Sequence, residues 1–161
     1  MISTWMISPA IVLAVIGVAG LFVNRIPAVL FAFVALIVAK FAGSEYLTLN
    51  RMWFWFAVTA LVLGIRFIQG NPFAPLRPGR LYVGAAAVCG TAVGYACQPA
   101  AAAIILGSAV GAFLGAVAYM STPRSPHYPV GSPDFLRFVS ALGLPAVATC
   151  SMAAIVGATL L

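Results

Sequence analysis

Apolar residues fill long continuous stretches of this chain, and polar residues gather in the short segments between them. Six apolar runs cover residues 6–23, 28–42, 52–68, 81–97, 100–120 and 135–161. An α-helix needs about 20 apolar residues to cross the hydrocarbon core of a bilayer. Strands of a transmembrane barrel would instead alternate apolar and polar residues. The pattern therefore predicts an all-α, polytopic bundle of about six transmembrane helices, forming one integral membrane domain over residues 1–161.

Proline, glycine and polar residues mark the expected connections. Residues 69–80 and 121–133 are both rich in proline, which is typical of loops. Gln98 and Pro99 alone separate the fourth run from the fifth, which predicts a tight helical hairpin over 81–120. The second and fourth runs are short, so one of them could be re-entrant or strongly tilted. Pro145 is expected to bend the sixth helix.

Composition supports a membrane location. Of 161 residues, 64% are hydrophobic and 6% are charged, whereas a soluble domain carries about 25% charged residues. Residues 81–123 contain no Asp, Glu, Lys or Arg. The bilayer is therefore the expected surrounding, and nucleic acid is not an expected partner.

Basic residues are distributed unequally between the two sides of the predicted bundle. The connections after the first, third and fifth helices collect Arg25, Arg66, Arg77, Arg80, Arg124 and Arg137. The other side has Lys40 and Arg51. By the positive-inside rule, the proline-rich loops face the cytoplasm of a bacterial inner membrane and both termini lie outside. Arg66 either extends its side chain to the cytoplasmic headgroups or joins Arg77, Arg80, Arg124 and Arg137 around a pocket for anionic lipid or an acidic partner.

Small residues recur at every fourth position in the fourth and fifth runs. They are Ala86, Gly90 and Gly94 in one, and Ala103, Gly107, Gly111 and Gly115 in the other. Helices in lipid associate through close backbone approach at such faces. Two interpretations stand: both faces pack against each other within one chain, or the hairpin also packs on a second copy of itself.

The segments "VLAVIGVAGLFVNRIPAVLFAF", "RPGRLYVGAAAVCGTAVGYA" and "ILGSAVGAFLGAV" resemble a family of small bacterial integral membrane proteins of unknown function that contain a glycine zipper. The resemblance implies a multi-pass protein of the bacterial inner membrane. It implies no activity, because the family has none established.

Side chains suited to catalysis are few. Glu45 and Asp134 are the two acids and fall on opposite sides of the predicted bundle, so they cannot act as a pair. Asp134 is expected to cap the sixth helix and to pair with Arg137. His127 has no second ligand at metal spacing, and Cys89, Cys97 and Cys150 are expected to be free thiols. We therefore expect no enzyme activity, no cofactor and no metal.

These features favour a non-catalytic accessory or structural subunit that packs through small-residue helix faces against itself or other membrane subunits. The alternative is a small transporter or channel for a small solute or ion. Paired apolar hairpins suit a transporter, but few polar residues are available to line a path.

Overall fold

The computed structural model describes residues 4–23, 27–69 and 77–160, and within these residues it contains helices and no strand. The elements are α1 (Thr4–Gly20), α2 (Ala28–Phe41), α3 (Leu49–Gln69), α4 (Arg77–Cys97), α5 (Ala101–Met120), α6 (Pro133–Phe138), the π-helical turn η1 (Val139–Gly143) and α7 (Leu144–Leu160). α6, η1 and α7 follow one another without a break. The all-helical class predicted from the sequence is confirmed.

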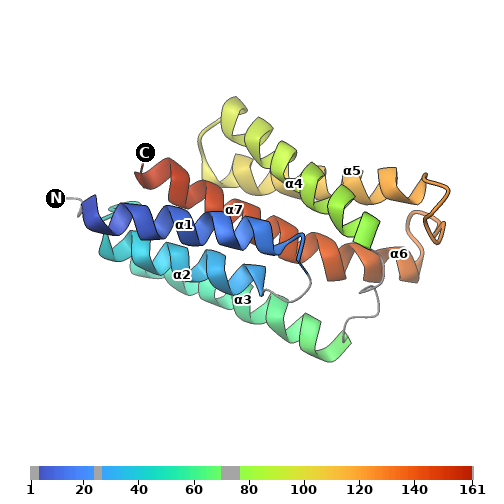
Figure 1. Cartoon of the computed structure of the whole chain (residues 1–161), viewed down its shortest axis with the longest axis horizontal. Helices are drawn as coiled ribbons and strands as arrows, with labels where there is room; N and C mark the ends of the chain where they lie inside the picture. The colour runs from blue at the N-terminus through green and yellow to red at the C-terminus, as the bar shows by residue number, and fades with distance from the viewer. Residues whose placement is uncertain (1–3, 24–26, 70–76, 161) are drawn as a thin grey trace.

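The helices run back and forth between two ends of an elongated bundle (Figure 1). α7 lies at its centre and packs against α1, α2, α3, α4 and α5. α1 pairs with α2, and α4 pairs with α5. α3 lies at the periphery and contacts α2, η1 and α7. The N- and C-terminal ends lie at the same end of the bundle (Figure 1).

Two apolar clusters form the core, one on each side of α7. The first joins α1, α2 and α3 to α7 through small and branched residues such as Ala32, Leu36 and Met152. The second joins α4 and α5 to α6 and α7, and it includes Tyr119 and Phe138, whose rings are stacked with centroids 5.7 Å apart. Small residues in the first cluster let the helices approach closely.

In the part of the chain that the structure describes, three helical stretches are long and apolar enough to cross a membrane: Leu49–Ile68, Ala101–Met120 and Pro133–Thr159. Trp5–Gly20 and Ala28–Phe41 are apolar but shorter. At 1.5 Å per residue, the 14 residues of α2 extend about 21 Å, which is less than the hydrocarbon thickness of about 30 Å. The membrane character follows from the longer helices, and the number of crossings stays a prediction.

The boundary of α4 differs from the prediction. Residues 77–80 were expected to belong to a loop, yet they form the first turn of α4. Proline is tolerated in a first helical turn, because its missing N–H would be unpaired there. Gly79 is buried in this turn, and a Cβ there would lie 2.8 Å from Cε1 of Tyr119. α4 therefore has 21 residues, as α3 has, but the added turn is polar, and the described α4 is not among the helices apolar enough to cross a membrane.

Pro145 lies in the first turn of α7, directly after η1. Its ring would clash with the carbonyl of Ala141 in regular α-helix and it has no N–H to donate. A π-helical turn, which holds one extra residue, precedes it. The wider turn thus gives the ring of Pro145 room within a continuous helix, and the bend expected at this residue stays a prediction.

Candidate functional site

α4 and α5 approach each other through backbone at their small residues. A Cβ added at Gly90 would overlap the carbonyl oxygen of Gly107, and one added at Gly107 would overlap that of Gly90. A Cβ at Gly111 would likewise overlap the carbonyl oxygen of Ala86. No residue larger than glycine fits at these positions without a shift of one helix.

The same contact continues in both directions along the hairpin. A Cβ at Gly94 would overlap the carbonyl oxygen of Ala103, and one at Gly115 would lie 2.5 Å from that of Tyr82. All seven small residues singled out in the sequence therefore lie where α4 and α5 meet. By contrast, a Cβ at Gly64 on α3 or Gly157 on α7 would meet nothing within 4 Å.

Hydroxyl groups lie in the middle of the bundle around α7. Ser108 on α5 and Ser151 on α7 are both fully buried, and their hydroxyl oxygens are 3.1 Å apart. Thr91 on α4 donates to the carbonyl of Ala87 at 2.7 Å. The hydroxyl of Thr149 on α7 is fully buried and has no hydrogen-bond partner among the described residues. The sequence pattern did not point to these residues, because isolated Ser and Thr are common in membrane helices.

Most of the described arginines gather at one end of the bundle. Arg66 is in the last turn of α3, Arg77 and Arg80 are in the first turn of α4, and Arg137 is in α6. The connection that holds Arg124 reaches the same end, opposite the end where both termini lie (Figure 1). Lys40 and Arg51 lie at the other end, in the last turn of α2 and the first turn of α3. Arg25 falls outside the described residues.

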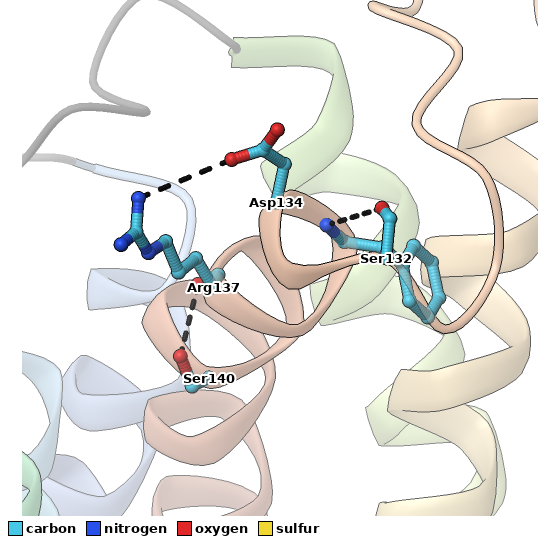
Figure 2. Close-up of polar contacts among 5 residues, drawn as sticks. Ser132, Asp134, Arg137 and Ser140 are labelled. Atoms are coloured by element: carbon cyan, nitrogen blue, oxygen red, sulfur yellow. Dashed lines mark hydrogen bonds and ion pairs between the residues drawn. The ribbon is translucent and has the colours of Figure 1, made fainter.

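Arg137 contacts Asp134 of α6 and Ser140 of η1, as Figure 2 shows. Its guanidinium lies 4.0 Å from the carboxylate of Asp134, as the spacing of three residues predicts, although both side chains are largely exposed. The expected capping role of Asp134 is wrong. Ser132 is the N-cap, and its hydroxyl accepts the backbone N–H of Phe135 at 3.2 Å. Asp134 lies in the first turn of α6, where its charge still favours the helix dipole.

His127 fixes the connection between α5 and α6. Its Nδ1 lies 3.0 Å from the carbonyl oxygen of Met120 and 3.1 Å from the hydroxyl of Ser125. Its backbone has φ of 51°, which is uncommon for a residue other than glycine. These contacts give His127 a structural role in the loop, which the sequence did not reveal because they depend on how the chain turns back.

Arg66 and Arg80 line the same cavity at the basic end. The cavity offers about 70 Å³ of space for the centres of water-sized molecules. Arg77, Arg124 and Arg137 are not part of its described walls. Burial, and next the positive charge of Arg66, lower the pKa of Arg80. Of the five arginines expected to surround a pocket, the structure thus brings two together.

Glu45 and Asp134 are at opposite ends of the bundle, since Glu45 lies in the connection from α2 to α3 and Asp134 in α6. The described residues contain no group of three or more His, Cys, Asp or Glu side chains that could hold a metal ion. Cys89 and Cys97 are exposed on α4 and Cys150 is buried on α7, all as free thiols.

No family model, no curated protein and no solved structure matches this chain. A functional assignment therefore depends on the geometry of its own residues. The resemblance to small glycine-zipper membrane proteins stays an expectation.

Proposed function

We propose that this chain is a non-catalytic integral membrane protein that acts as an accessory or structural subunit. The observation that supports this proposal most is the exposure of α3. In its membrane-crossing window 17% of the residues are buried, against 33% in α5 and 50% in the Pro133–Thr159 helix. A long apolar helix held so loosely by its own chain offers a broad surface to another membrane subunit.

The outward side of α3 is rich in aromatic side chains. Trp53, Phe54 and Phe56 are each at least half exposed, and Phe67 is 91% exposed. Large aromatic residues are enriched where proteins associate, because they provide much contact area at little entropic cost. They are also frequent at the membrane interface, so lipid is the competing occupant of this surface.

The α4–α5 contact favours the interpretation in which the small-residue faces meet within the chain. Each glycine of one helix lies against the backbone of the other helix, so α4 and α5 cover each other's small-residue faces. A second subunit would then bind through α3 rather than through the glycines.

Purification in mild detergent from the native membrane tests the proposal, with mass and stoichiometry of the purified species as the readout. A photo-crosslinking residue at Phe56 of α3 is compared with one at Val93, which is exposed on α4. We expect a protein crosslink from the α3 position and only lipid adducts from the α4 position. A species that runs as a monomer, with lipid adducts alone from both positions, would contradict a subunit role.

The second candidate, a small transporter or channel, has the buried hydroxyls around α7 in its favour. Ser108, Ser151 and Thr149 are fully buried, and they are the polar groups that a path through the bundle would use. Cys150 is the diagnostic thiol, because it is buried next to them, whereas Cys89 and Cys97 are exposed on the outside of α4. Labelling of Cys150 by a water-soluble thiol reagent in the folded protein would support a path, and no labelling of Cys150 would count against it.

A further inference from the structure

An apolar groove of about 530 Å³ lies between α1 and α7. Its described walls come from α1, the turn that follows α1, and the second half of α7, and no polar side chain occurs among them. Ala14 and Val156 are buried and form its floor. Val15 and Phe22 are 62% and 40% exposed and lie at its rim. The groove therefore opens toward the outside of the bundle, where lipid surrounds a membrane protein.

Gly157 shows that the groove is open space within reach of a side chain. A Cβ added at this wall residue would meet nothing within 4 Å. Gly17 on α1 differs, because a Cβ there would lie 3.0 Å from the backbone nitrogen of Ala32 on α2. α1 is thus closely packed on α2, whereas α1 and α7 leave a gap between them on the groove side.

The dimensions of the groove suit a hydrocarbon chain better than a helix. It follows the chain from Ile11 to Phe22, which at 1.5 Å per residue is about 17 Å. Dividing the volume by this length gives a mean cross-section of about 30 Å². A helix about 10–12 Å across has a cross-section of about 80 Å² or more. The length is close to half of the hydrocarbon thickness of about 30 Å, which is the depth of one leaflet.

One end of the groove points toward the basic end of the bundle (Figure 1). A Cβ at Gly84 would lie 3.0 Å from Cε1 of Phe22, so the second turn of α4 meets this end of the groove. Arg77 is the first residue of α4 and is exposed. Residues seven apart share a helix face, so Arg77 lies on the same side of α4 as Gly84, about 10 Å nearer the end of the bundle. Positive charge at this level of the membrane favours an anionic headgroup.

We propose that the groove holds one acyl chain of an anionic phospholipid, with the headgroup at the Arg77 end. The acyl chain fills space that α1 and α7 leave empty, and so provides dispersion contacts that the lining residues otherwise lack. It contacts protein on two sides, whereas lipid against a single helix contacts protein on one side. The inference goes beyond the proposed function, because it names a lipid ligand that either an accessory subunit or a transporter could hold.

Native mass spectrometry of the purified full chain measures the lipid bound per chain. Phosphatidylglycerol and phosphatidylcholine with identical acyl chains are added at increasing concentration in a mild detergent. Gly157→Leu fills the groove, because its side chain extends into open space. Gly64→Leu is the matched control, since Gly64 is equally open but lies on α3, outside the described groove walls.

We expect the wild type and Gly64→Leu to retain a single phosphatidylglycerol per chain and Gly157→Leu to lose it. Arg77→Gln should lower the affinity for phosphatidylglycerol about fivefold, which is the contribution of one arginine near a membrane surface. Lys40→Gln removes the same charge at the other end of the bundle and should leave the affinity unchanged. Thermal unfolding without added lipid verifies that Gly157→Leu folds, and its midpoint should equal or exceed that of the wild type.

A phosphatidylglycerol with a diazirine near the middle of its acyl chain locates the bound chain in the wild type, independently of any variant. The label should concentrate on peptides of α1 and α7. Equal lipid binding by the wild type and Gly157→Leu would overturn the site, and so would label spread evenly over the exposed helices. A dimer of this chain that Gly157→Leu abolishes would place a second copy in the groove instead. Equal affinities for the two lipids would overturn the anionic headgroup.

Discussion

Replacing Gly90 with alanine adds one methyl group between two helix backbones. The new Cβ would overlap the carbonyl oxygen of Gly107 and lie 3.0 Å from the Cα of Gly111. The overlap with the carbonyl oxygen is the tighter of the two, and non-bonded atoms are optimally spaced at about 3.5–4.0 Å, so α4 and α5 must separate by about 1 Å or more. Such a gap forfeits about a quarter to a half of the dispersion energy of the neighbouring contacts.

The expected magnitude follows from two opposing effects. Extra methyl groups in tightly packed interiors cost about 1–3 kcal/mol. Alanine is favoured over glycine within a helix by up to about 1 kcal/mol, which offsets part of this cost. We expect Gly90→Ala to lower the free energy of unfolding by about 1–2 kcal/mol, and a larger residue in the same contact, as in Gly111→Leu, to reduce the yield of folded protein.

Gly64→Ala is the matched control. Gly64 is also inside a helix, but a Cβ there meets nothing within 4 Å, so only the gain in helix propensity remains. Its free energy of unfolding should be equal to that of the wild type or higher by up to about 1 kcal/mol. Reversible unfolding in mixed detergent micelles, followed by tryptophan fluorescence, compares the three proteins. Equal stabilities for Gly90→Ala and Gly64→Ala would refute the close-approach argument.

Three further contacts lead to predictions of smaller changes in stability. Ser132→Ala removes the N-cap of α6 and should cost about 1 kcal/mol, measured by the same unfolding assay; no change would mean that another group caps the helix. Replacing Ser108 and Ser151 singly and together with alanine should reveal a coupling energy of about 0.6 kcal/mol, and additive effects would deny a hydrogen bond between them. Asp134→Asn should change stability by less than about 1 kcal/mol, because its pair with Arg137 is exposed, and a larger loss would indicate a further partner.

Spacing alone predicted the residues at which α4 and α5 meet. Residues four apart share one face of a helix, and the Gln98–Pro99 connection is too short to let the two helices separate. The basic end was likewise predictable, since helices that alternate in direction bring every second connection to the same end (Figure 1).

The composition of the cavity could not be predicted in this way. Arg66 and Arg80 line one cavity because α3 and α4 both pack against η1, and the spacing of charges in the sequence does not encode that placement. The N-cap at Ser132 did have a local signal. A serine before a proline and an acid, as in Ser132-Pro133-Asp134, is the usual order for an N-cap followed by the first helical turn.

The wider turn of η1 makes room for Pro145 without changing which faces of α6 and α7 meet the rest of the bundle. A π-helical turn takes one residue more than an α-helical turn, so the extra residue is absorbed within Val139–Gly143. Deleting one residue there would let the stretch close into regular α-helix, with Phe135 and Phe138 still facing Phe113 and Tyr119. The ring of Pro145 would then clash with the carbonyl one turn before it. A lineage that shortened this stretch by one residue would have to replace Pro145 as well, so we expect the wider turn and the proline to be kept or lost together.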